Sequence, residues 1–133
     1  MDNLQVDALV VGGGIAGMQA ALDIADQGFQ VALIEREPSI GGKMITLSKV
    51  FPTLDCCSCI TTPKMSAVAH HPNIKLLTYC ELKAVNDAAE GFQVSVVQKP
   101  RYVDASKCTG CRKCEYECPI TVASPFDRGL GSY

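Results

Sequence analysis

The chain has 133 residues, among them 8 cysteines, with 12 lysines and arginines against 14 aspartates and glutamates. A net charge of −2, only 6% aromatic residues and no tryptophan argue against a nucleic-acid-binding surface. The length suits one domain and is too short for an oxidoreductase with two complete dinucleotide-binding halves. No apolar run approaches the roughly 20 residues that cross a bilayer, so we expect no membrane span.

The cysteine content favours metal or cluster ligation over a disulfide scaffold. The first five residues, MDNLQ, have neither the basic nor the apolar region of a secretion signal. The chain then opens directly into a strand and a glycine-rich loop, as intracellular enzymes do. We therefore expect a reducing, cytoplasmic environment, in which thiols remain available as ligands.

The first 35 residues predict a βαβ unit. Residues 5–11 are short, apolar and valine-rich, which indicates a buried parallel strand. Residues 18–27 are alanine-rich with apolar residues at helical spacing, and Gly28 follows as a helix-ending glycine. Residues 30–35 form a second apolar run, which predicts the second strand.

The glycine-rich turn between the first strand and the helix has the spacing Gly12-x-Gly14-x-x-Gly17. In dinucleotide-binding folds the first glycine permits a tight turn, the second admits the pyrophosphate, and the third lets helix and strand pack closely. The helix N-terminus then offers free N–H groups to the phosphates. Glu35, at the end of the second strand, lies where an acid binds a ribose. A merely structural glycine turn is the alternative, but strand, glycines, helix, strand and acid all follow in order.

A further glycine pair, Gly41-Gly42, follows Glu35 and Arg36. This stretch resembles the FAD-binding half of the glutathione-reductase-like flavoproteins, which implies FAD rather than NAD. A Glu at the ribose position also argues against a 2′-phosphate. The predicted FAD-binding residues are Gly12, Gly13, Gly14, Ala16, Gly17, Glu35, Arg36 and Gly42.

The middle of the chain predicts one helix and three strands. Thr62 and Pro63 suit an N-cap and a first helical residue, so we expect a short helix over residues 64–70. His70 and His71, just before Pro72, are interpreted as capping or surface residues. Three strands follow: a third parallel strand over residues 73–79, then an antiparallel pair over residues 81–86 and 92–98, joined through residues 87–91.

Near the C-terminus, four cysteines have the spacing C-x2-C-x2-C-x3-C-P, which is the iron–sulfur run of bacterial-type ferredoxins. Cys108, Cys111 and Cys114 are predicted to bind one [4Fe–4S] cluster. Cys118 either closes that cluster or serves a second one, whose own cysteine run the sequence lacks. We expect the second case, in a chain that is part of a longer polypeptide. Zinc is the alternative, although it usually takes two separated C-x2-C pairs.

Cys56, Cys57 and Cys59 form a tighter group, in which Cys56 and Cys59 make a C-x-x-C pair. Three roles remain open for them: ligands of another cluster, a redox-active dithiol near the flavin, or plain thiols. Cys80, at the end of a predicted strand, is interpreted as a small buried apolar residue.

Several further motifs occur in one order with the glycine fingerprint and the cysteine run. They are Phe51-Pro52-Thr53-Leu54-Asp55-Cys56, Thr62-Pro63-Lys64-Met65, His71-Pro72-Asn73-Ile74, Lys99-Pro100-Arg101-Tyr102-Val103-Asp104 and Cys108-Thr109-Gly110-Cys111. In this combination the chain resembles the A-type flavoprotein of heterodisulfide reductase and the related flavoprotein of the quinone-interacting oxidoreductase complex.

The resemblance implies a cytoplasmic electron-transfer protein with FAD and several iron–sulfur clusters. Its partners would be other redox proteins of a heterodisulfide-reductase-like complex, with a ferredoxin or a hydrogenase-type donor. It also implies cluster ligation by Cys56 and Cys59, whereas Cys57 has no counterpart in that pattern. The chain starts at the glycine fingerprint and ends before a second cysteine run, so we expect an N-terminal portion that is inactive in isolation.

We therefore predict an α/β chain with two domains. Residues 1–100 would form a Rossmann-like FAD-binding domain with a small antiparallel β segment, and residues 101–133 an incomplete ferredoxin-like α+β segment for a 4Fe–4S cluster. The predicted function is electron transfer between flavin and clusters. The alternatives are a non-catalytic cofactor-binding adaptor that docks on a redox partner, and a zinc-stabilised nucleotide-binding domain.

Overall fold

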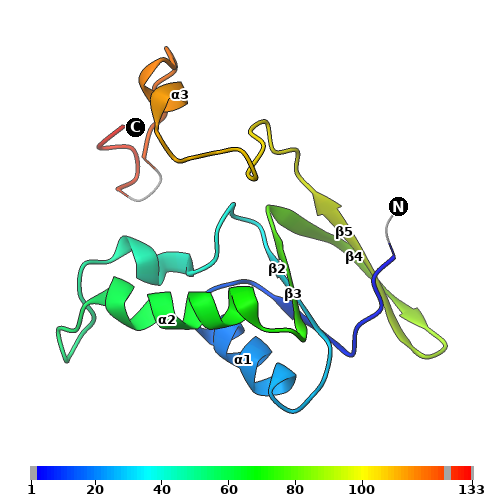
Figure 1. Ribbon diagram of the computed structural model, residues 1–133. Coiled ribbons are helices and arrows are strands. Elements are labelled where there is room, and N and C mark those ends of the chain that lie inside the picture. Colours follow the sequence, from blue (N-terminus) through cyan, green and yellow to red (C-terminus); the bar gives the residue numbers. More distant parts are fainter. Residues whose placement is uncertain (1–2, 125–126, 133) are drawn as a thin grey trace. The chain divides into compact units, whose positions relative to one another are not determined.

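The computed structural model describes residues 3–124 and 127–132, which belong to two units, Met1–Lys99 and Pro100–Tyr133 (Figure 1). Residues 1–2, 125–126 and 133, which fall within the two predicted domains, lie outside the described residues. In the part of the chain that is described, no helix is long and apolar enough to cross a membrane.

A three-stranded parallel sheet forms the centre of the first unit. Its strands β1 (Ala8–Val11), β2 (Val31–Glu35) and β3 (Ile74–Thr78) lie side by side in sequence order. All five residues of the middle strand β2 are buried, whereas β1 and β3 are mostly half-buried. The predicted βαβ unit and the third parallel strand are thus confirmed, with each strand a little shorter than its apolar run.

Two helices, α1 (Ile15–Ala25) and α2 (Cys57–His70), pack against each other and against the sheet (Figure 1). Each connects one parallel strand to the next in the same direction, and right-handed crossovers then place both helices on one face. The core between helices and sheet is made mostly by small and branched apolar side chains, with Met18 as the exception. Its buried members are Met18, Ala21, Ala25, Val31, Leu33, Ile40 and Val68.

Helix α2 begins earlier than the sequence predicts. Thr62 and Pro63 were expected to start it, but the helix begins at Cys57, and Pro63 lies inside it. Cys57 and Thr61 are fully buried one helical turn apart, and Val68 continues the same face into the core. This burial offsets the penalty of an internal proline, which a local capping pattern does not take into account. The predicted end at His70 is confirmed, with His71 as the C-cap.

A two-stranded antiparallel sheet, β4 (Cys80–Ala88) and β5 (Gly91–Gln98), completes the first unit. The predicted hairpin is confirmed, but its strands are longer and its turn is correspondingly shorter than expected. Val94 and Val96 are half-buried, while Phe92 is 74% exposed. Cys80 is 3% exposed, as expected of a small apolar residue at a strand end.

The second unit contains little regular structure. Its one described helix, α3 (Lys113–Tyr116), is a single turn that carries Cys114, and an isolated bridge joins Ala123 to Ser132. Its described residues are exposed or half-buried. A segment this short buries too little apolar surface for a stable fold by itself. Such segments are usually stabilised by a bound metal or a partner.

Candidate functional site

The glycine turn and Glu35 meet because the carboxyl ends of parallel strands share one edge of the sheet. Val11 pairs with Ile34, so the residues that follow each strand are also neighbours. One carboxylate oxygen of Glu35 accepts the backbone N–H of Gly13 at 2.6 Å, and the other accepts that of Glu37 at 2.9 Å. Glu35 is only 8% exposed. The predicted ribose acid therefore also holds the predicted phosphate loop in place.

The N-terminus of α1 is open toward this edge. Gly14 is its N-cap and has no side chain with which to satisfy the first helical N–H groups. A Cβ built on Gly14 would meet no atom within 4 Å, so the space in front of these amides is free. Together with the helix dipole, this arrangement fits a pyrophosphate. Ala16, in the first turn of the helix, is exposed on the surface.

Close backbone packing explains three of the predicted glycines. A Cβ on Gly17 would lie 1.9 Å from the carbonyl oxygen of Gly12, which itself adopts a φ of +100° that glycine favours. A Cβ on Gly42 would lie 3.0 Å from the Cα of Gly14. The later glycine pair therefore packs against the fingerprint, and Gly41 donates its N–H to the Gly13 carbonyl at 2.7 Å. This close packing keeps the loop free of side chains, which fits a bound dinucleotide such as FAD.

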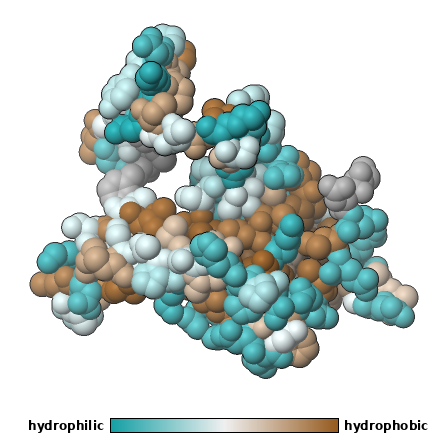
Figure 2. Space-filling view, viewed as in Figure 1, coloured by the Kyte–Doolittle hydropathy of each residue, from teal (hydrophilic) through white to brown (hydrophobic). Residues whose placement is uncertain are grey.

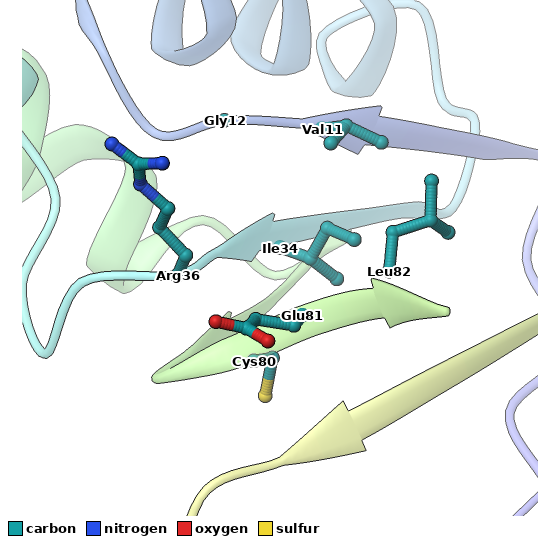
Figure 3. Close-up of a pocket in the computed structure, with 7 residues that line it drawn as sticks. All are labelled: Val11, Gly12, Ile34, Arg36, Cys80, Glu81 and Leu82. Carbon is teal, nitrogen blue, oxygen red and sulfur yellow. The ribbon is translucent and has the colours of Figure 1, made fainter. Parts of the chain in front are cut away.

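A cavity of about 300 Å³ lies next to this loop (Figure 3). It lies between the ends of β1 and β2 and the start of β4. Its lining residues are Val11, Gly12, Ile34, Arg36, Cys80, Glu81 and Leu82. Arg36, which is exposed, makes a 3.4 Å ion pair with Glu37.

Glu81 and Lys99 form an ion pair at this cavity, and no sequence pattern predicted either of them as a site residue. Lys99 Nζ lies 2.5 Å from Glu81 Oε1 and 5.3 Å from the centre of the Tyr79 ring. The hydrogen bond from Lys99 lowers the pKa of the Glu81 carboxyl, and the same bond raises the pKa of Lys99. Glu81 begins the predicted hairpin, and Lys99 directly follows it and opens the Lys99-Pro100-Arg101-Tyr102-Val103-Asp104 motif, but neither signal indicated an ion pair.

The four cysteines of the C-terminal run are free thiols on the surface. Gly110 and Arg112 both have positive φ values, so the chain turns sharply between them. Hydrogen bonds from the Lys113 backbone and then the Thr109 side chain lower the pKa of Cys111. Among residues 3–124 and 127–132, no three His, Cys, Asp or Glu side chains converge to hold a metal ion. The donor set, four unpaired thiols at ferredoxin spacing, fits an iron–sulfur cluster.

Cys56, Cys57 and Cys59 lie at the start of α2. Cys56 is the N-cap, and its Sγ accepts the Cys59 backbone N–H at 3.3 Å. Hydrogen bonds from Cys59, first its thiol and then its backbone, lower the pKa of Cys56, and the thiol pairing raises that of Cys59. Both are exposed, whereas Cys57 points into the core and is fully buried. The structure thus separates a structural cysteine from an exposed pair.

Comparison with known proteins supports both the dinucleotide site and the iron–sulfur site. The family model for FAD-dependent oxidoreductases matches residues 7–57, and the 4Fe–4S binding domain model matches residues 101–121. The fold of the first unit is similar to L-proline dehydrogenase from P. horikoshii, with a TM-score of 0.62 and 31% identity over 70% of this chain and 19% of that one. The protein is therefore of the FAD and iron–sulfur oxidoreductase class, and the predicted FAD and [4Fe–4S] cofactors are confirmed.

Curated relatives identify the family. The chain is 53% identical, over 98% of its own length, to the second A-type iron–sulfur protein of the CoB–CoM heterodisulfide reductase of Methanopyrus kandleri. It is 52% identical, over 93% of its length, to the A-type component of the H2:CoB–CoM heterodisulfide,ferredoxin reductase of Methanothermobacter marburgensis. The chain belongs to this A-type family of heterodisulfide reductase subunits. It spans only about a fifth of these relatives, 21% and 19% respectively.

Proposed function

We propose that this chain holds FAD and a [4Fe–4S] cluster and relays electrons between them as part of a heterodisulfide-reductase-like complex. The observation that carries the proposal is the contact between Glu35 and the glycine turn, since one buried carboxylate organises both halves of a dinucleotide site. When bound, FAD exchanges electron pairs and iron–sulfur clusters pass single electrons. The chain's own part is to bind and orient these groups.

In this proposal the pyrophosphate of FAD lies at the N-terminus of α1 and the adenosine ribose at Glu35. Each carboxylate oxygen of Glu35 already accepts one backbone N–H, and an ionised carboxylate has about four acceptor sites. Two sites thus remain for ribose hydroxyls. The proposed FAD contacts are Gly12, Gly13, Gly14, Ala16, Gly17, Glu35, Arg36 and Gly42.

The proposed cluster ligands of the second unit are Cys108, Cys111 and Cys114, with Cys118 as ligand either of the same cluster or of another. Cys56 and Cys59 are proposed to ligate a further cluster. Both side chains are exposed, and Cys56 is the N-cap of α2, where a thiolate is stabilised. The fully buried Cys57 is left out of the ligand set.

The proposed partners are other redox subunits. The M. marburgensis relative is named for H2, ferredoxin and a heterodisulfide, which suggests a ferredoxin or a hydrogenase-type donor. Apolar side chains on the surface support docking, and Figure 2 shows hydrophobic areas on the face in view. Among the exposed apolar residues, Phe51 is 91% exposed and Leu54 is 60% exposed, both shortly before Cys56 in the sequence. The proposed location is the cytoplasm, because the cysteines of the C-terminal run and those at the start of α2 are free thiols.

A second candidate is a non-catalytic adaptor that binds a cluster and docks on a partner without flavin. The exposed second unit, whose cysteine run is independent of the glycine loop in sequence, favours it. The two candidates differ in whether flavin is present on the same molecules as iron.

The test is anaerobic purification of the full chain, with flavin, iron and acid-labile sulfide measured on one sample. We expect FAD, released by denaturation and identified by chromatography, together with iron and sulfide in equal amounts. Iron and sulfide without flavin binding would favour the adaptor. Zinc without sulfide would contradict the cluster assignment and favour the zinc-stabilised domain.

A further inference from the structure

We propose that the side chains of Arg112, Glu115 and Tyr116 form a clasp that positions the C-terminal cysteine run for its iron–sulfur cluster and slows loss of the bound cluster. The inference rests on the proposed cluster ligands. It adds three positioning residues that lie between the cysteines and do not bind iron themselves.

Arg112 has a backbone conformation that arginine rarely adopts. Its φ is 61° and its ψ is 8°, in the left-handed region, where the Cβ of an ordinary residue is crowded by the backbone. Glycine adopts this conformation without that cost, and Gly110, two residues earlier, has a φ of 68°. An arginine at a position that suits glycine indicates that its side chain has a role there.

The side chain of Arg112 contacts two residues of α3, the short helix of the second unit (Figure 1). Its Nε and Nη2 atoms donate hydrogen bonds to the two carboxylate oxygens of Glu115, at 2.8 and 2.7 Å. The central carbon of its guanidinium lies 5.5 Å from the centre of the Tyr116 ring. The paired hydrogen bonds and the contact with the ring together fix both the position and the plane of the guanidinium.

The clasp has the same spacing as two of the predicted ligands. Arg112 directly follows Cys111 in the chain. Glu115 directly follows Cys114, so the ion pair and the two thiols span the same i, i+3 step. The Arg112 carbonyl also accepts the N–H groups of Glu115 at 3.0 Å and of Tyr116 at 3.1 Å. A clasp that holds this turn closed therefore also fixes the backbone from which the two thiols project.

The second unit has few other contacts that could hold this turn. Its described residues are exposed or half-buried, so apolar burial contributes little. A single helical turn is also unstable by itself in water. The clasp limits the conformations of the cysteine run before the cluster binds. Because reopening of the turn exposes a bound cluster to competing ligands, the clasp also slows its loss.

The ion pair also balances charge next to the cluster. A [4Fe–4S] cluster held by thiolates is anionic, and its reduction potential depends on the charges around it. Without Arg112, the unpaired Glu115 carboxylate would disfavour the added electron. Without Glu115, the unpaired guanidinium would favour it. Two substitutions that both open the clasp should therefore shift the potential in opposite directions.

The experiment measures how fast an iron chelator removes the cluster from the full, anaerobically purified chain. We expect Arg112→Gly, Arg112→Gln and Glu115→Gln each to lose the cluster about threefold faster than the wild type, the effect of one well-aligned exposed ion pair. Arg112→Gly also relieves the backbone conformation, so faster loss in this variant assigns the effect to the side chain. Lys113→Gln is the matched control, because it removes a positive charge from the next residue and leaves the clasp in place.

Three further measurements separate the clasp from a general weakening of the second unit. The double variant Arg112→Gln with Glu115→Gln should lose the cluster no faster than either single variant, because both remove the same contact. Arg112→Lys, which keeps the charge and one hydrogen bond, should be intermediate. The reduction potential of the cluster should fall in Arg112→Gln and rise in Glu115→Gln.

The FAD content of each variant checks that the first unit is folded. Wild-type rates of cluster loss in Arg112→Gly and Glu115→Gln would overturn the clasp and leave the proposed function intact. Equally fast loss in Lys113→Gln would reduce the effect to net charge and would also overturn it. A wild-type chain without iron and sulfide would instead reject the proposed cluster, together with the inference that rests on it.

Discussion

Glu35 has a structural role in addition to the ribose-binding role that the sequence pattern predicts. It is proposed to bind the ribose of the dinucleotide, and it also links the glycine turn to the start of the following loop by accepting two backbone N–H groups. A buried carboxylate is stable only when such donors surround it. The order of the glycine turn therefore depends on the same side chain that is proposed to bind the ligand.

Replacing Glu35 by Gln should destabilise the chain even without FAD. The amide oxygen can accept one N–H, but the amide nitrogen then faces the other donor, and hydrogen bonds to charged groups contribute about 2 kcal/mol. We expect the free energy of unfolding in urea titrations to fall by about that amount and FAD binding to weaken. Glu37→Gln, an exposed acid with a surface ion pair, should change stability by less than about 0.5 kcal/mol. An equal loss in both variants would contradict the structural role of Glu35.

Substitutions at Gly14 and Gly17, two glycines of the same motif, should affect different properties: FAD binding at Gly14 and stability at Gly17. Gly17→Ala places a methyl group 1.9 Å from a backbone oxygen, so α1 must move off the strand, at a cost of about 3 kcal/mol or more. Gly14→Ala meets no atom within 4 Å and should cost less than about 1 kcal/mol, while its methyl group fills the space for the pyrophosphate. We expect Gly17→Ala to lower the urea midpoint and Gly14→Ala mainly to weaken FAD binding in fluorescence titrations. The opposite pattern would place the phosphates elsewhere.

At the scale of elements, the unit depends on how α2 is fixed at its two ends. Its start is determined by the burial of Cys57 and Thr61. Its end is fixed by His71, whose Nε2 lies 3.2 Å from Asp26 beyond α1 and whose Nδ1 accepts the Asn73 N–H at 3.1 Å. Asn73 in turn donates to the Ala25 carbonyl at 3.1 Å. The ends of both helices and the start of β3 are thus linked.

Removing His71 should loosen this junction. His71→Ala deprives the Asn73 N–H of its acceptor and Asp26 of its neighbour, and we expect a loss of about 1 kcal/mol in urea unfolding. His70→Ala is the matched control, because His70 is exposed and its Nδ1 contacts the Ser66 carbonyl of its own helix. The control should lose less than about 0.5 kcal/mol. If both variants lost the same free energy of unfolding, the junction role of His71 would be contradicted, and both histidines would be simple surface residues.

At the scale of the whole molecule, the chain joins two units that differ in what stabilises them. The first unit has a buried core between a parallel sheet and two helices. The described part of the second has one short helix and four exposed thiols. Relatives share both parts at more than half identity, which agrees with a flavin segment and a cluster segment in one polypeptide.

Loss of one cofactor should therefore leave the other bound. Cys111→Ser removes a central thiolate of the ferredoxin run, and we expect the iron and sulfide content of the second unit to be lost while FAD is retained. Cys80→Ser, a buried thiol of the first unit, should leave iron unchanged. Iron, sulfide and flavin assays with anaerobic absorption spectra test this. Full iron in Cys111→Ser would show that this thiol is not a ligand.

The sequence by itself determined the βαβ unit, the glycine turn with its acid, and the cysteine spacing, because each depends on residues close together in the chain. It placed the start of α2 wrongly, since burial of Cys57 and Thr61 outweighs the local signal of Thr62 and Pro63. Only the tertiary structure brought Glu81 from the hairpin to the cavity beside Gly12, and divided the cysteines at the start of α2 into a buried one and an exposed pair. The position of Glu81 and the burial of these cysteines depend on contacts between segments far apart in sequence, which no local pattern encodes.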